Sequence, residues 1–105
     1  MQLARETYRS SEQFPSSEIL GLRFQMRRSA VSVASNIAEG HGRLTDPQFK
    51  NCLGMARGSL FELETQVELA ADLKFLDREA ADQLLGLSTE TAKLINGLLG
   101  VLHTE

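Results

Sequence analysis

One apolar stripe between residues 49 and 70 constrains the fold of this chain more than any other feature. Apolar side chains recur there at alternating steps of four and three residues: Phe49, Leu53, Ala56, Leu60, Leu63, Val67 and Ala70. This spacing follows the 3.6-residue turn of an α-helix and lasts three heptads, which is typical of helices packed in a bundle. It predicts one long helix, and no strand-like alternation competes with it.

Two helical segments precede this stripe. The first, Met1–Gln13, is short and ends at Phe14-Pro15, because the residue before a proline is pushed out of the α region. The second is expected to start near Ser16 or Ser17, either of which can cap it, and to stop at Gly40-His41-Gly42.

The third and fourth segments carry their own start signals. Thr45-Asp46-Pro47-Gln48 is a predicted capping box, and Asp77 caps a last segment that runs to about Leu102. With 105 residues and 42% apolar content, the chain is expected to form one domain over residues 1–105. The sequence therefore predicts an all-α, antiparallel up-down-up-down four-helix bundle with a short first helix.

Small residues repeat at a spacing of four on two of these segments. They are Ala30, Ala34 and Ala38 on the second and Gly54 and Gly58 on the third. In a bundle such a repeat indicates tight packing between the two helices. The last segment carries two apolar stripes, beginning at Leu84 and Leu85, which indicate either a subunit interface or a helix deeply buried in its own bundle.

Charge is divided unequally along the chain. Residues 1–57 carry a net charge of +3 and residues 58–105 carry −6, which gives the total of −3. The isoelectric point near 5.4 opposes a typical nucleic-acid binder. The two halves can neutralise each other within one chain or pair head to tail with copies of the chain.

No constellation for catalysis, a cofactor or a metal stands out. Di-iron bundles need Glu-x-x-His, and neither His41 nor His103 is preceded by such a glutamate. The lone Cys52 fits a buried small hydrophobe in a reducing cytoplasm. No apolar run reaches a membrane span, and no small-molecule substrate is evident. We expect a non-enzymatic, cytoplasmic protein.

A row of polar side chains on the second helix stands out among apolar neighbours. Arg28, Ser32, Asn36 and Glu39 lie close together at helical spacing, and Glu64 lies in an acidic row on the third helix. Buried charges need partners, so we expect these five residues to form a structural network between helices or subunits. The alternative is a contact with a ligand or nucleic acid.

Several motifs resemble one bacterial family. They are Phe14-Pro15, the run from Gln25 to Val33, Ser35-Asn36-Ile37-Ala38-Glu39-Gly40, and Gly58-Ser59-Leu60 followed by Glu62-Leu63-Glu64-Thr65. Together they resemble the four-helix-bundle proteins encoded in 23S rRNA intervening sequences, over about residues 14–76. The chain is also similar to the accessory protein of diversity-generating retroelements, a basic pentamer that binds reverse transcriptase and nucleic acid.

The resemblance implies an antiparallel bundle that assembles as a homopentamer and has no enzymatic activity. The sequence then favours a macromolecular partner, with RNA or a ribonucleoprotein first. Arg23, Arg27 and Arg43 are the expected contacts, alongside Arg28. The alternative is a protein-interaction scaffold without any nucleic-acid role.

Overall fold

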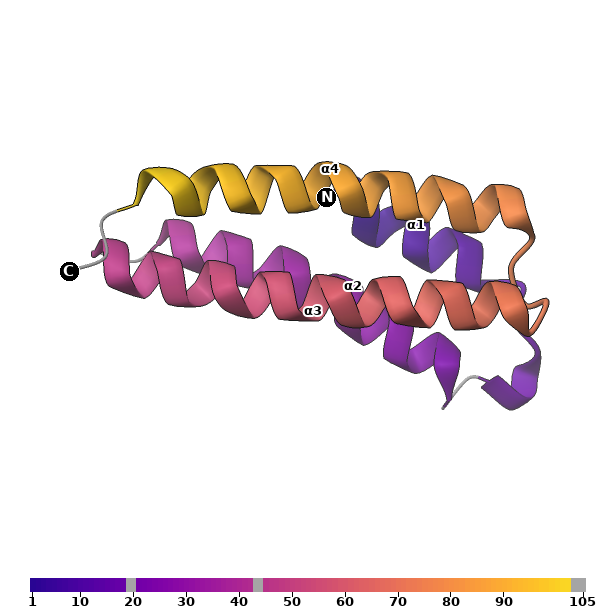
Figure 1. Cartoon of the computed structure of the whole chain (residues 1–105). Helices are drawn as coiled ribbons and strands as arrows, with labels where there is room; N and C mark the ends of the chain where they lie inside the picture. The colour runs from indigo at the N-terminus through magenta and orange to yellow at the C-terminus, as the bar shows by residue number, and fades with distance from the viewer. Residues whose placement is uncertain (19–20, 43–44, 103–105) are drawn as a thin grey trace.

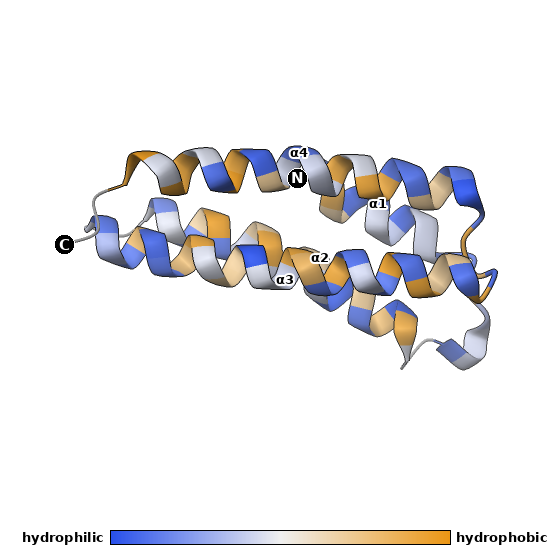
Figure 2. Ribbon diagram, in the orientation of Figure 1, coloured by the Kyte–Doolittle hydropathy of each residue, from blue (hydrophilic) through white to orange (hydrophobic). Residues whose placement is uncertain are grey.

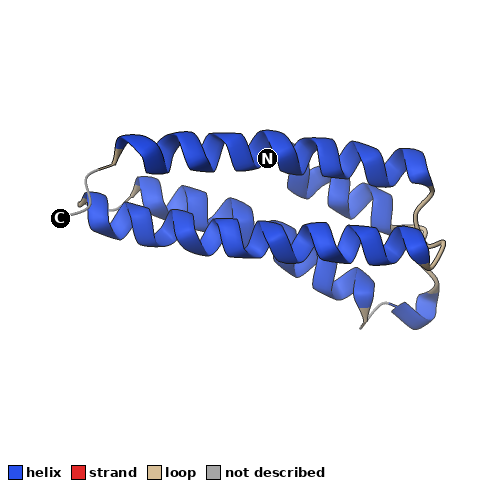
Figure 3. Cartoon of the chain, in the orientation of Figure 1, coloured by secondary structure: helices blue, strands red, loops and turns tan. Residues whose placement is uncertain are grey.

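The computed structural model describes residues 1–18, 21–42 and 45–102, and within these ranges every regular element is a helix (Figures 1 and 3). The four α-helices are α1 (Gln2–Ser11), α2 (Leu22–His41), α3 (Asp46–Asp72) and α4 (Arg78–Val101), with a short 3-10 turn at Ser16–Glu18. The predicted all-α fold with a short first helix is confirmed.

The helices form an elongated bundle of about 46 × 23 × 18 Å. α3 packs between α2 and α4, and α1 contacts both α2 and α4. α1 is much shorter than its neighbours, so the N-terminus lies halfway along α4 and the other half of α4 has no α1 beside it (Figure 1).

The core follows the stripe that the sequence predicts on α3. Six of its seven residues, from Leu53 to Ala70, are fully buried, and Phe49 is half-buried at the end. Met26 and Val33 of α2 and Leu84 and Ile95 of α4 close over them. The residues of this stripe thus line the inside of the bundle, and hydrophobic and hydrophilic residues follow one another along each long helix (Figure 2).

The predicted start of the second helix is wrong. Ser16 and Ser17 lie in the 3-10 turn, and α2 begins only at Leu22. The Glu18 carboxylate accepts a hydrogen bond from the Leu22 amide at 3.0 Å, so a longer side chain caps the helix from further back. The predicted caps of α3 and α4 are confirmed, since Thr45 accepts from the Gln48 amide and Asp77 from the Ala80 amide.

The glycines expected at the contact between α2 and α3 do not lie there. Gly54 and Gly58 are exposed, and a Cβ added at either would meet nothing within 4 Å. The close approach is at Gly40 in the last turn of α2, where a Cβ would lie 2.5 Å from Cδ1 of Phe49. α2 and α3 can converge at this end of the bundle because residue 40 has no side chain.

α4 uses most of its wide apolar arc inside its own bundle. Leu84 and Ile95 are buried, and five leucines are half-buried against the core: Leu85, Leu87, Leu98, Leu99 and Leu102. Only Leu94 and Val101 stay exposed among the apolar residues of α4 that the structure describes. Packing within the bundle therefore accounts for much of this arc.

Replacing Gly40 by leucine should destabilise the protein, because the new side chain would overlap the Phe49 ring and separate α2 from α3. We expect a loss of about 1–3 kcal/mol in the free energy of unfolding. The measurement is urea denaturation followed by far-UV circular dichroism. Gly86→Leu on the open face of α4 is the control and should gain up to about 1 kcal/mol from helix propensity. Equal stability of the two variants would contradict the close approach.

Candidate functional site

Arg27 is the most connected arginine of α2, and its contacts dock α1. Its Nε donates to Ser11 Oγ at 2.8 Å and its Nη2 donates to the Tyr8 carbonyl at 2.9 Å. The guanidinium also lies 4.4 Å from the centre of the Tyr8 ring and 3.8 Å from the Glu12 carboxylate. Only 19% of the side chain is exposed. The residue expected to contact nucleic acid is therefore engaged in holding two helices together.

The other predicted arginines are placed differently. Arg23 is half-buried, and its Nε is buried without a hydrogen-bond partner. Arg28 is exposed on α2. Arg43 lies outside the described residues. Of the predicted contacts, Arg23 and Arg27 thus share the face where α2 meets α1, and Arg28 points away from the core.

α1 contributes two arginines that the sequence analysis did not select. Arg5 and Arg9 are one turn apart on its exposed side, and Arg9 is 3.2 Å from Glu6. Tyr8 beside them is 43% exposed. The sequence could have identified this pair, because the two arginines are four residues apart, on one helix face, and lie on either side of the chain's single tyrosine. We call Arg5, Tyr8, Arg9, Arg23 and Arg27 the basic face.

The basic face belongs to the positively charged part of the structure. Residues 1–18 and 21–42 together hold five arginines, no lysine and four acids. Residues 58–102 hold three basic residues and eight acids. No ion pair joins α2 to α3 in the part of the chain that the structure describes, so direct pairing between these two helices does not neutralise the arginines.

The polar row on α2 forms a hydrogen-bonded seam, with different partners from those expected. Ser32 Oγ lies 2.8 Å from Ser59 Oγ of α3, and Asn36 Nδ2 donates to the Ser32 carbonyl at 2.9 Å and to its hydroxyl at 3.2 Å. A small cleft of about 220 Å³ lies alongside. Its lining residues are Gln25, Arg28, Ser29, Ser32, Ser59 and Glu62. Ser59 and Glu62 were missed because their helix face depends on how α3 packs.

Two members of the predicted network lie elsewhere. Glu64 is half-buried seven residues after Arg57, whose Nη1 donates to Asn96 of α4 at 3.0 Å. Residues seven apart share a helix face, so Glu64 is on the α4 side of α3, away from Arg28. Glu39 is exposed in the last turn of α2. The structure thus brings Ser32 and Asn36 together and leaves Arg28 at the rim of the cleft.

The acidic row at the end of α3 has a partner on α4. Arg78 Nη2 donates to Glu68 at 3.3 Å and Arg78 Nε donates to Asp82 at 2.9 Å. These hydrogen bonds, to Asp82 first and Glu68 second, raise the pKa of the Arg78 guanidinium above its usual value. All three side chains are more than half exposed, so the bridge adds little stability.

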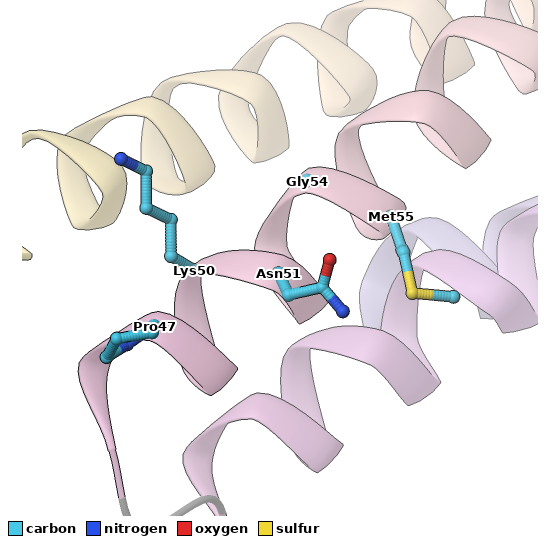
Figure 4. A pocket seen from close by; sticks show the side chains of 5 residues that line it. All are labelled: Pro47, Lys50, Asn51, Gly54 and Met55. Carbon is cyan, nitrogen blue, oxygen red and sulfur yellow. The ribbon is translucent and has the colours of Figure 1, made fainter. Parts of the chain in front are cut away.

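A second depression lies on the outer side of α3, and Lys50 is the one charged residue in its lining (Figure 4). It is lined by Pro47, Lys50, Asn51, Gly54 and Met55. Residues 1–18, 21–42 and 45–102 contain no cluster of three potential metal ligands. None of the helices described is long and apolar enough to cross a membrane. The surface with the most distinctive chemistry in the part of the chain that the structure describes is therefore the basic face.

The sequence of the chain matches a known protein family. The sequence profile of the 23S rRNA-intervening sequence protein family matches residues 1–97. The chain belongs to this family. A solved structure with the same fold is a protein of unknown function from the S23 ribosomal protein family of Bacteroides thetaiotaomicron VPI-5482. It is 21% identical, with a TM-score of 0.76 over 92% of this chain and 97% of that one. No protein with a curated description matches the chain.

Within this member of the 23S rRNA-intervening sequence family, Arg27→Ala should detach α1. The substitution removes the hydrogen bonds to Ser11 Oγ and the Tyr8 carbonyl and the cation–π contact with the Tyr8 ring. The hydroxyl of Ser11 stays buried and has one hydrogen-bond partner fewer. We expect a loss of about 1–3 kcal/mol in the free energy of unfolding. Tyr8 is the only tyrosine and the chain has no tryptophan, so its fluorescence reports on α1 directly during urea denaturation.

Arg5→Ala is the matched control, because Arg5 is exposed and its side chain has no ion pair or hydrogen bond within the described ranges. It should change stability by no more than about 0.5 kcal/mol. An Arg27→Ala protein as stable as the Arg5→Ala protein would show that Arg27 does not dock α1.

Proposed function

We propose that this protein is a non-enzymatic, self-assembling helical bundle of the bacterial cytoplasm that binds RNA, alone or within a ribonucleoprotein. The observation that carries the proposal is the basic face, where Arg5 and Arg9 flank the exposed Tyr8 above the anchored Arg27. The family's link to 23S rRNA supports the choice of RNA.

The electrostatic potential beside a group of arginines determines whether a phosphate backbone is attracted, more than the net charge of the whole protein does. Arg5 and Arg9 extend from α1, whereas most acids lie on α3 and α4. Arg27 covers one side of the Tyr8 ring, and 43% of Tyr8 is exposed, so the ring offers a surface on which one base can stack. With so few stacking residues, binding should depend on phosphates and be indifferent to sequence. Arg23 and Arg43 stay proposed contacts at the edge of this face.

A second candidate function is a protein-interaction scaffold with no nucleic-acid role. The exposed apolar side chains of α3 favour it, since Met55 and Phe61 are 55% and 56% exposed. Large apolar side chains left in water commonly mark protein contacts. The two candidates use different faces, so RNA titration separates them.

Changing Arg5 and Arg9 together to alanine should weaken RNA binding and its salt dependence. Each lost phosphate contact lowers the slope of log affinity against log salt by about 0.7 for single strands, so we expect a decrease of about 1.4. The measurement is fluorescence anisotropy of a labelled RNA titrated at several salt concentrations. Lys74→Ala with Lys93→Ala removes the same charge elsewhere and should leave the slope unchanged. RNA binding through this face would be contradicted if both double variants gave the same slope, or if the unmodified protein bound no RNA at about 50 mM salt. The scaffold function would then be favoured.

Self-assembly is the second part of the proposal. The opposed charges of the two halves favour contacts between copies, and the family resemblance implies five. Light scattering should therefore return a mass near five times 11.6 kDa at micromolar concentration. A mass of 11.6 kDa at every concentration would exclude assembly and leave the RNA titration unaffected.

A further inference from the structure

Tyr8 presents one free aromatic surface in the middle of the basic face. The guanidinium of Arg27 lies over the ring, 4.4 Å from its centre, so one side of the ring is covered. Tyr8 is nevertheless 43% exposed, and this exposed area belongs to the other side and the edge of the ring. An aromatic surface in contact with water is what nucleic-acid bases stack on.

The ring of Tyr8 is held in place before any ligand binds. Arg27 Nη2 donates to the Tyr8 carbonyl at 2.9 Å, and Arg27 Nε donates to Ser11 Oγ at 2.8 Å. The arginine that covers the ring therefore also ties the backbone of the tyrosine to α2. Ser11 is fully buried, so the connection is anchored in the interior of the bundle. A surface that is already ordered loses little conformational entropy on binding.

Two exposed arginines flank the ring along α1, which lies beside α4 in the bundle (Figure 1). Arg5 is one helical turn before Tyr8 on the same side of α1, and Arg9 follows Tyr8 directly. In a nucleic-acid strand, each base is likewise flanked by a phosphate before it and a phosphate after it. The order of arginine, tyrosine and arginine on α1 thus matches the order of phosphate, base and phosphate on one strand.

The positive charge around the ring is modest. Arg9 lies 3.2 Å from the carboxylate of Glu6. Arg27 lies 3.8 Å from the carboxylate of Glu12, and the buried Nε of Arg23 has no hydrogen-bond partner among the residues described. Four arginines against these two acids give a net charge of +2 for this surface. Such a charge attracts every phosphate backbone weakly, so a base stacked on Tyr8 makes a large difference to the affinity.

An unpaired base can reach the ring, and a paired base cannot. The bases of a duplex are stacked on one another, and the deep, narrow major groove of duplex RNA does not admit side chains. The Tyr8 ring is also held against Arg27, so it is not free to insert between paired bases. In a single strand the bases can turn outward and stack on an aromatic side chain.

We propose that the basic face selects single-stranded over duplex RNA. One unpaired base stacks on the free side of Tyr8, and the phosphates before and after it bind Arg5 and Arg9. Arg27 is a positioning residue that supports the ring from the side away from the base. Arg23, one turn from Arg27 on α2, extends the path toward a further phosphate. This inference rests on the proposed RNA binding and names the structural class of the RNA.

The first test compares three labelled RNAs by fluorescence anisotropy at one salt concentration. They are a short single strand, the same strand annealed to its complement, and a strand of equal length without bases. Stacking of one base on an aromatic side chain corresponds to a change in affinity of about 5- to 150-fold. The normal strand should therefore bind at least about fivefold more tightly than the strand without bases, which keeps every phosphate. It should also bind more tightly than the duplex.

The second test removes the ring. Tyr8→Leu keeps an apolar side chain on α1 and should lower the affinity for the single strand about 5- to 150-fold. The affinity for the duplex should change by no more than about twofold, because phosphate contacts with the arginines persist. Detachment of α1 would weaken both, so the unequal loss separates stacking from docking. Phe61→Leu is the matched control, since it removes a ring of α3 that is 56% exposed, and should change neither affinity.

The third test needs no substitution. Tyr8 is the only tyrosine and the chain has no tryptophan, so the protein's emission comes from this ring. A base stacked on the ring quenches its emission, once the light absorbed by the RNA has been corrected for. At equal saturation, the single strand should quench Tyr8, and the strand without bases should leave its emission nearly unchanged.

Three results overturn this inference. They are equal affinities for the strand and its duplex, equal affinities for strands with and without bases, and equal affinities of the Tyr8→Leu and Phe61→Leu proteins for the single strand. In each case RNA still binds, so the proposed function stands and only the stacking on Tyr8 is excluded. If none of the RNAs bound at about 50 mM salt, the proposed function itself would be contradicted, and the inference with it.

Discussion

The bundle depends on the buried stripe of α3. Leu53, Leu60 and Val67 are wholly removed from water, and the other helices close around them. Burying a leucine or valine side chain contributes about 1.5–3 kcal/mol, so this stripe supplies much of the free energy that opposes chain entropy. α3 packs against α2 and α4 with this stripe, and its opposite side stays exposed to water.

α1 is attached by a different kind of interaction. It is short, and its inner side buries the polar Thr7 and Ser11 along with Leu3. Arg27 therefore connects it to α2 through polar and cation–π contacts in place of a long apolar seam. The same contacts fix Tyr8 and orient α1 so that Arg5 and Arg9 face outward. Docking of the first helix and formation of the basic face are one event.

The two surfaces proposed for partners lie on different parts of the bundle and differ in chemistry. The basic face on α1 and the inner edge of α2 presents arginine and tyrosine, which suits a phosphate backbone. The outer side of α3 presents exposed apolar side chains such as Met55 and Phe61, which suit a protein partner. The proposed self-assembly would repeat the basic face once per copy, and the charge of one copy would add to that of the next.

The sequence alone determined the helical fold, the buried stripe and two of the caps. These follow from periodicity and from side chains that act on their own backbone, which are local properties of the chain. Tertiary structure alone decided where the glycines and arginines act. Gly40, rather than Gly54 or Gly58, allows the close approach of α2 to α3, and Arg27 turns inward whereas Arg5 and Arg9 turn outward. Spacing shows which residues share a helix face, but only packing decides whether that face meets another helix or water.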